Sequence, residues 1–357
     1  MRIRNTTINS GFNTGSTAGV TRTNNQPARR PHPFTRGTTV VSSNLSSPTM
    51  LLKKPDSQLA GVTVGPGTAL KVVGYRDGWH KVETMGEEKT RGWVSGRTGP
   101  ELEPQMSVPG CDRKYVEFDK VDGEAFTGPV KVEDINQGWL GDCYLIAGMA
   151  ALAHSNPGAI RNAIRKGDKE GTWVVTFDRV ADNGRNYGKR EIVVNNWFPT
   201  KDDHLLYANG GKKGKERYNV EEFENGSRPM WPAIIEKAFA TMLGGYDQLD
   251  KGGMEAAVFE ALTGNDPDEY DVGRFGTDDN KACIDELKRA LRRGAPVAVS
   301  SKMHKVLPNV YSCHVYVAVG YSKDKVILRN PHDTRDTMAL SYKDFSRASE
   351  TICIANT

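Results

Sequence analysis

Cys143 is the residue whose setting most clearly indicates chemistry. It lies at the expected start of an apolar helix, within the stretch NQGWLGDCYLIA that runs from 136 to 147. The positive end of a helix dipole stabilises a thiolate at such a position. A cysteine there is more often just a small buried residue. However, Gln137 lies six residues upstream and can present its amide as an oxyanion donor beside the Cys143 backbone N–H. Together the two residues indicate a nucleophilic thiol.

A thiol nucleophile needs a base, and the base needs an orienting group. His314 precedes the apolar run 315–319, and Asn330 follows the next apolar run, 325–328. A single histidine beside a strand is usually structural. Adjacent strands could nevertheless place Asn330 next to His314, where the amide carbonyl would accept the imidazole N–H and fix its tautomer. The chain order Cys, His, Asn is that of papain-like thiol hydrolases.

Several motifs in one order resemble the protease core of the calpains. The segment around Cys143 is similar to the calpain pattern Q-G-x-L-G-D-C-W-L-L-A. The likeness continues through NNWFPTKD at 195–202, WPAIIEKAFA at 231–240, the glycines Gly252 and Gly253, and RNP at 329–331. It covers roughly residues 112–357.

The resemblance implies a two-lobed protease core of the α+β class. It places Cys143 in a helical lobe, residues 112–250, and places His314 and Asn330 in a β-rich lobe, residues 251–357. It also implies endopeptidase activity through a thioester acyl-enzyme, with Gln137 at the oxyanion. Because the chain ends with the second lobe, we expect no further calpain modules after it.

One departure from the family pattern lies beside the proposed triad. Calpains resemble N-P-W-G after the catalytic asparagine, whereas this chain has Asn330, Pro331, His332 and Asp333. The tryptophan would shield the His–Asn hydrogen bond from water. We expect His332 to cover only part of that area.

The family also implies a calcium site in each lobe, and both look incomplete here. Asp134 matches one acidic ligand of the first site, but Pro229 stands where a second acid is expected. The acidic loop of the second site is largely deleted. Calcium takes six to eight oxygens, several of them charged. We therefore expect weak or absent calcium dependence and no cofactor for the chemistry itself, although neighbouring carboxylates or carbonyls could rebuild a site.

Apolar periodicity predicts the elements that position these residues. Helical spacing predicts helices over 143–153, 233–243, 254–262 and 281–292. Strand-like runs lie at 172–177, 191–194, 296–300, 315–319, 325–328 and 351–355. The strands gather towards the end of the chain, which favours an α+β lobe pair over alternating βαβ units.

The first third of the chain has a different composition. Residues 1–50 carry six Arg and no Asp or Glu, and they predict a disordered basic arm. Residues 51–98 alternate short apolar runs with glycine turns, a pattern that resembles a bacterial SH3-like β-barrel containing Trp79 and Trp93. Residues 99–111 predict a linker. The ligand of the barrel, a peptide or a cell-wall component, is not fixed by the sequence.

Composition excludes several classes of protein. The chain has 357 residues and a net charge of +4, which comes from the arginine-rich arm, so we expect no nucleic-acid partner. No apolar run is long enough to span a membrane. No secretory signal of the usual kind is recognisable, and a free catalytic thiol favours the cytoplasm, although export by another route stays open.

Three functions fit these residues. The first is a cysteine endopeptidase acting on protein or peptide substrates. The second is an idle calpain-like scaffold that uses the SH3-like domain for binding. The third is a thiol acyl transferase on the same triad, although a transglutaminase normally has Asp where this chain has Asn330. Retention of Gln137, Cys143, His314 and Asn330 favours the first, because a scaffold needs none of them.

Overall fold

The computed structural model describes most of the chain after residue 116. The described residues are 39–42, 49–54, 61–64, 69–76, 79–84, 89–95, 102–104 and 117–357, with gaps at 169, 181–185, 202, 209–217 and 244–245. The predicted disordered arm lies outside the described residues up to 38.

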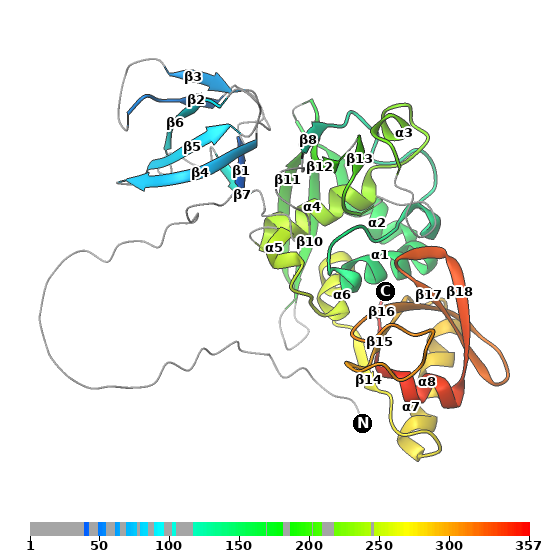
Figure 1. Cartoon of the computed structure of the whole chain (residues 1–357). Coiled ribbons are helices and arrows are strands. Elements are labelled where there is room, and N and C mark those ends of the chain that lie inside the picture. Colours follow the sequence, from blue (N-terminus) through cyan, green and yellow to red (C-terminus); the bar gives the residue numbers. More distant parts are fainter. Residues whose placement is uncertain are drawn as a thin grey trace, which may run out of the picture.

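The first half of this region is built around α1, Cys143–Ser155 (Figure 1). Every residue of the helix from Tyr144 to Ala153 is buried, as expected for a helix that is apolar all round. The other helices of this half are α2 (Pro157–Ala163), α3 (Val220–Glu224), α4 (Trp231–Leu243), α5 (Tyr246–Leu249) and α6 (Glu255–Thr263).

Two small antiparallel sheets complete this first half. One has the strand order β11-β10-β9 and the other β13-β12-β8. Their bounds are β8 (Glu117–Lys120), β9 (Ile164–Lys166), β10 (Thr172–Val180), β11 (Asn186–Asn195), β12 (Trp197–Lys201) and β13 (His204–Leu205).

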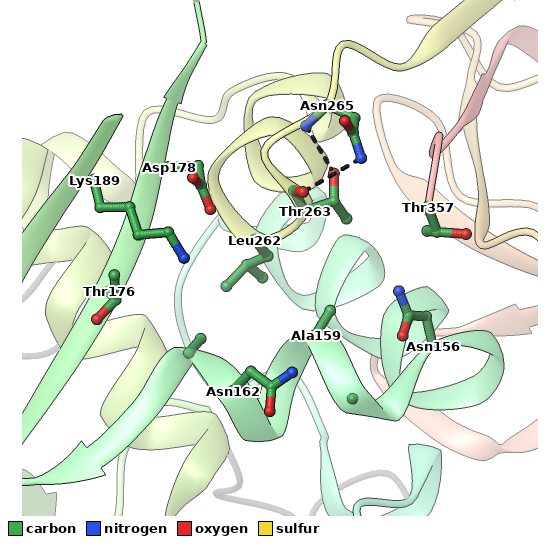
Figure 2. A pocket seen from close by; sticks show the side chains of 12 residues that line it. Asn156, Ala159, Asn162, Thr176, Asp178, Lys189, Leu262, Thr263, Asn265 and Thr357 are labelled. Carbon is green, nitrogen blue, oxygen red and sulfur yellow. Dashed lines mark hydrogen bonds between the residues drawn. The ribbon is translucent and has the colours of Figure 1, made fainter. Parts of the chain in front are cut away.

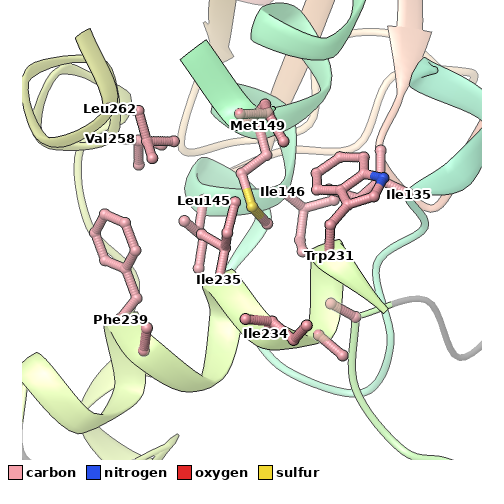
Figure 3. Close-up of a cluster of buried hydrophobic side chains, with 14 of the residues drawn as sticks. Ile135, Leu145, Ile146, Met149, Trp231, Ile234, Ile235, Phe239, Val258 and Leu262 are labelled. Carbon is pink, nitrogen blue, oxygen red and sulfur yellow. The ribbon is translucent and has the colours of Figure 1, made fainter. Parts of the chain in front are cut away.

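The core of this half lies between α1, α4 and α6. Figure 3 shows Leu145, Ile146 and Met149 of α1 facing Ile234 and its neighbours on α4, with Val258 and Leu262 of α6 on the far side. A Cβ on Gly148 would meet Val258 at 2.8 Å. The close approach of α1 and α6 therefore requires glycine at that position.

A six-stranded antiparallel sheet forms the second half, in the order β14-β19-β15-β16-β17-β18. Its strands are β14 (Asp268–Asp271), β15 (Val297–Ser301), β16 (Val315–Tyr321), β17 (Lys325–Asn330), β18 (Asp333–Ser341) and β19 (Ser349–Ile354). Two helices, α7 (Asp278–Arg292) and α8 (Tyr342–Ala348), pack against it.

Both faces of this sheet are covered, and the alternation of side chains shows how. On β16, Val315 and Val317 join the core around α1, whereas Tyr316 and Ala318 join the core under α7 and α8. Successive side chains of a strand point to opposite faces. The sheet is thus sandwiched, and α1 lies against the face that carries Val315.

The sequence predicted these principal elements well. Each of the four predicted helices and six predicted strands overlaps an observed element. α6 falls in the range assigned to the β-rich lobe, yet Ala256, Val258 and Phe259 pack in the core around α1. The change from one core to the other therefore comes after Thr263.

The part of the chain before residue 105 also forms strands, both within the range predicted for the barrel and on either side of it. A five-stranded sheet has the order β6-β5-β4-β1-β7, and β2 pairs with β3. The bounds are β1 (Thr39–Ser42), β2 (Thr49–Leu51), β3 (Val62–Val64), β4 (Ala69–Arg76), β5 (Trp79–Thr84), β6 (Arg91–Ser95) and β7 (Leu102–Pro104).

These pairings correct two boundaries. β1 comes from the predicted disordered arm and β7 from the predicted linker, and the two strands pair with each other. Neighbouring β-branched residues, Thr39, Val40 and Val41, favour an extended chain once a partner strand is present. The resemblance to an SH3-like barrel remains a prediction.

We expect Lys237 to be a main source of stability in the first half. Its buried ammonium donates to Asn195 Oδ1 and, at 2.7 Å, to the carbonyl of Trp197. Lys237→Met would remove the ammonium donor from both buried acceptors, although Asn195 Oδ1 would keep the Trp197 N–H, and should lower the free energy of unfolding by about 2–4 kcal/mol. Chemical denaturation measures this. Lys281→Met, on an exposed helix position, is the control and should change it by less than about 0.5 kcal/mol.

Candidate active site

Cys143 occupies the first position of α1, with Asp142 as the N-cap residue. The tight entry to the helix depends on Gly141, whose N–H donates to Asp250 Oδ1 at 2.7 Å. A Cβ at position 141 would lie 2.8 Å from the carbonyl oxygen of Asp250. The entry turn therefore requires a residue without a side chain, and it points the Cys143 backbone N–H out of the helix end.

The thiol of Cys143 is half-buried, and burial is the main cause that raises its pKa to about 11. Hydrogen bonds from the backbones of Val315 and Tyr144 act in the opposite direction. In the resting protein the proton therefore stays on sulfur at neutral pH. The contact with Val315 places the thiol beside the residue that directly follows His314.

His314 is held rigidly at the start of β16. Its backbone N–H donates to Ser301 Oγ at 3.0 Å, and its carbonyl accepts from the Ser301 N–H at 2.8 Å. Cys313 immediately before it has a φ of 50°, a left-handed conformation that turns the chain into the strand. Burial is the main cause that lowers the pKa of the imidazole to about 4, so the ring is neutral at pH 7.

His314 and Asn330 are joined directly. The imidazole Nε2 lies 2.9 Å from Asn330 Oδ1, and the backbone N–H of His332 donates to the same oxygen at 3.0 Å. A backbone N–H can only donate, so the atom facing both groups must be the amide oxygen. Nε2 therefore carries the hydrogen, and Nδ1 keeps a free lone pair that can accept a proton.

Strand register explains this contact. In the pairing of β16 with β17, Val317 lies opposite Arg329, so the end of β17 lies beside the start of β16. The sequence argument anticipated this arrangement from two neighbouring apolar runs.

Aromatic rings enclose His314, and the sequence reasoning missed two of them. The rings of Tyr316 and Tyr311 meet it edge-on, at centroid distances of 5.0 and 5.7 Å. His332 stacks on it at 4.9 Å with an interplanar angle of 9°. Tyr316 could have been found from the sequence, because residues two apart on a strand share a face.

Gln137 also lies at this junction. Its backbone N–H donates to the carbonyl of Pro331 at 2.8 Å, which links the segment before α1 to the residue after Asn330. Its side-chain Nε2 donates to the Leu140 carbonyl at 2.7 Å. The structure thus brings Gln137 close to the other candidate residues, and its side-chain amide also bonds to the buried Asp142 carboxyl.

Two buried acids, Asp142 and Glu236, lie beneath the start of α1. Burial is the main cause that raises the pKa of Asp142, to about 7, and that of Glu236 well above its usual value. Glu236 Oε1 accepts from the Ala208 N–H at 2.9 Å. Two adjacent carboxyl groups away from water cannot both ionise, so the pair holds a proton at neutral pH.

The carboxylate of Asp134, the expected calcium ligand, is used in hydrogen bonds within the protein. Its Oδ2 accepts from the Lys131 N–H at 2.9 Å and from Trp231 Nε1 at 3.2 Å, and Pro229, two residues before Trp231, is buried. No group of three or more His, Cys, Asp or Glu among the described residues is placed to hold a metal. This donor set does not fit a hard divalent cation.

A separate hollow of about 310 Å³ lies away from these residues (Figure 2). It is lined by α2, α6 and the sheet residues Thr176, Asp178 and Lys189. None of the candidate catalytic residues lines it.

Comparison with known proteins identifies the family of this chain. The family model described as calpain family cysteine protease matches residues 120–335, which is more than half of the chain. The chain belongs to the calpain family. The family match does not include the N-terminal strands.

Individual calpains are similar over a shorter stretch. The chain is 28% identical to the calpain-1 catalytic subunit of Rattus norvegicus over 169 residues, 47% of this chain and 21% of that protein. It is 30% identical to calpain-8 of Rattus norvegicus over 172 residues, 47% and 21% of the two chains, and 29% identical to calpain-B of Drosophila melanogaster over 140 residues, 39% and 13%. It therefore matches about a fifth or less of these relatives' length.

No described helix is long and apolar enough to cross a membrane.

The carboxyl pair predicts an unusual pH dependence of stability. Glu236 keeps its proton in the folded protein and loses it in the unfolded chain above its ordinary pKa, so rising pH favours unfolding. Glu236→Gln removes this penalty and retains an acceptor for Ala208. We expect the variant to be more stable than the parent at pH 8, by on the order of 2 kcal/mol. At pH 5.5 we expect a smaller gain in stability.

Thermal or urea unfolding at the two pH values measures the difference. Glu191→Gln, at an exposed ion pair with Arg165, is the matched control and should follow the parent at both. A Glu236→Gln variant whose stability stays parallel to the parent's would show that the pair holds no proton.

Proposed function

We propose that this chain is a cysteine endopeptidase whose catalytic residues are Cys143, His314 and Asn330. The observation that carries the proposal is the hydrogen bond from His314 Nε2 to Asn330 Oδ1. It leaves Nδ1 of His314 as the basic atom. The next residue, Val315, contacts the Cys143 thiol. Family membership supports the same chemistry.

Acylation begins with transfer of the thiol proton. As the sulfur of Cys143 attacks the scissile carbonyl carbon, its proton moves to Nδ1 of His314, and Nε2–H stays on Asn330. The thiolate and the imidazolium form together, because burial disfavours either charge alone. The imidazolium then gives its proton to the leaving amine, the C–N bond breaks, and a thioester remains on Cys143.

Deacylation uses the same groups, with water as the nucleophile and Cys143 as the leaving group. Nδ1 takes a proton from water, the hydroxide attacks the thioester carbonyl, and the C–S bond breaks. The proton returns to the sulfur, so the cycle ends with the acid product and the resting thiol.

The developing oxyanion needs donors that are already in place. We assign this role to the Cys143 backbone N–H at the helix end and to the Gln137 side chain. Leu140 accepts one hydrogen of Gln137 Nε2, and the Asp142 carboxyl is the amide's other side-chain partner. We propose that this second bond is exchanged for one to the oxyanion. The α1 dipole favours negative charge at the same point.

Removing the nucleophile tests the proposal directly. Cys143→Ala should lower cleavage of casein by about 10⁴-fold or more and abolish labelling by an epoxide that targets papain-like thiolates, without loss of folding. His314→Ala should lose nearly as much, because members of a triad act as a unit. Asn330→Ala should lose about 10²-fold, the typical cost of a misplaced catalytic group.

Cys313→Asn is the matched control for thiol chemistry. Cys313 is exposed and has the left-handed backbone that asparagine tolerates, so the variant should keep both label and cleavage. Labelling without cleavage, together with incorporation of an amine into casein, would identify an acyl transferase instead. A parent protein that takes no label would be an idle scaffold.

A further prediction of the proposed function concerns calcium. Three contacts join the two halves without a metal: Gln137 N–H to Pro331 O, Arg329 to Glu133 at 3.0 Å, and Ser300 Oγ to Glu255 at 2.7 Å. We therefore expect cleavage of a peptide substrate to change less than about twofold between excess chelator and excess calcium, since Pro229 stands where the acid expected beside Asp134 is missing.

Asp134→Asn sharpens this test, because the amide oxygen can still accept from Lys131 and Trp231 while the charge is lost. Calorimetric titration of the Cys143→Ala protein with calcium gives a readout that does not depend on activity. A large gain in cleavage on adding calcium that Asp134→Asn abolishes would contradict this prediction.

A further inference from the structure

His332 is placed against the candidate base in a way that the proposed reaction does not yet use. Its ring lies parallel to that of His314, with an interplanar angle of 9° and 4.9 Å between centroids. Its backbone N–H donates to the same Asn330 oxygen that accepts from His314. The ring of His332 thus contacts His314, and its backbone contacts Asn330.

The stack is fixed from a second side by Tyr311. The phenol ring stands edge-on to both imidazoles, at 5.7 Å from His314 and 5.9 Å from His332. The Tyr311 N–H donates to the Tyr316 hydroxyl at 2.8 Å, which ties this loop to β16. His332 still has an exposed side, so its ring can exchange a proton with solvent.

We propose that His332 is a positioning residue of the reaction: as a neutral ring it holds the His314 imidazole against Asn330, and when it binds a proton it disables that imidazole. The proposal rests on the proposed function, because it acts through the base of that mechanism.

Electrostatics gives the reason. The thiolate can form only if His314 accepts a positive charge, and a neutral ring stacked on an imidazolium tolerates that charge. Two imidazolium rings about 5 Å apart repel each other by the equivalent of roughly 0.6 to 2.4 pH units, for effective dielectric constants between about 80 and 20. A proton on His332 therefore opposes the step that activates Cys143.

The surrounding groups leave the two imidazoles as the main partners. The titratable side chains whose rings face the stack are the phenols of Tyr311 and Tyr316, and burial raises the pKa of Tyr316 to about 12. The thiol of Cys143 contacts the backbone of Val315, the residue after His314. Asp333 follows His332 in the chain. Burial lowers the pKa of His332, and its charge is one cause that lowers the pKa of His314.

The pH profile of kcat/KM tests the proposal. His332→Phe keeps an aromatic ring and removes the titrating group. We expect its acid limb to lie about one pH unit below that of the parent, its basic limb to be unchanged, and its rate at pH 7.5 to stay within about threefold. His332→Ala should lose about tenfold or more in kcat at every pH with KM unchanged, because the ring no longer supports His314.

His304→Phe, on an exposed position of the preceding loop, is the matched control and should leave both limbs in place. A role in folding alone would lower the rate of His332→Phe equally at all pH values and would not move the acid limb. Superimposable acid limbs of His332→Phe and parent would overturn the proposal.

A second measurement separates this proposal from the proposed function. In the Cys143→Ala background, the ¹³C signals of labelled histidine report protonation without any substrate. We expect the His314 signal to follow two titration steps, and to follow one after His332→Phe. A single step in both proteins overturns the coupling, whereas two steps in a protein that cleaves nothing would preserve the coupling and overturn the protease assignment.

Discussion

The packing of α1 against strands β15 and β16 is the interaction on which the rest of the structure depends. Val315 and Val317 enter the core around the helix, so the amino end of α1 and the amino end of β16 come to the same place. Cys143 is the first residue of one element and His314 directly precedes the other. A change in this packing would separate the thiol of Cys143 from His314, its proposed base.

Burial has opposite effects on the two parts of the site. It raises the pKa of the Cys143 thiol and lowers that of the His314 imidazole, so neither group is charged at rest. The same dry surroundings strengthen the Asn330 hydrogen bond and the helix dipole once a thiolate and an imidazolium form together. The protein therefore favours a charged pair over either single charge, which is what a transient ion pair on the reaction path requires.

The buried carboxyl groups beneath the first turn of α1 destabilise the folded protein when they ionise. Asp142 and Glu236 are almost fully buried, and only a shared proton makes this arrangement acceptable. Gly141 makes the close approach to Asp250 feasible, and Lys237 satisfies carbonyl groups on the far side of α4. The contact of Gly141 with Asp250 fixes the start of α1, and the contacts of Lys237 hold α4 to β11 and β12.

The sequence by itself determined the candidate residues, the family and the principal elements. Cys143, Gln137, His314 and Asn330 stand in motifs with fixed spacing, and apolar periodicity is a local property that a sequence displays directly. The pairing of β1 with β7, the membership of α6 in the first core and the ring stack of His332 on His314 were decided only by tertiary structure. Each of these joins residues that are distant in the chain or whose orientation depends on a neighbouring element. Local spacing carries no information about such contacts, because long-range packing chooses among conformations that the local sequence leaves equally accessible.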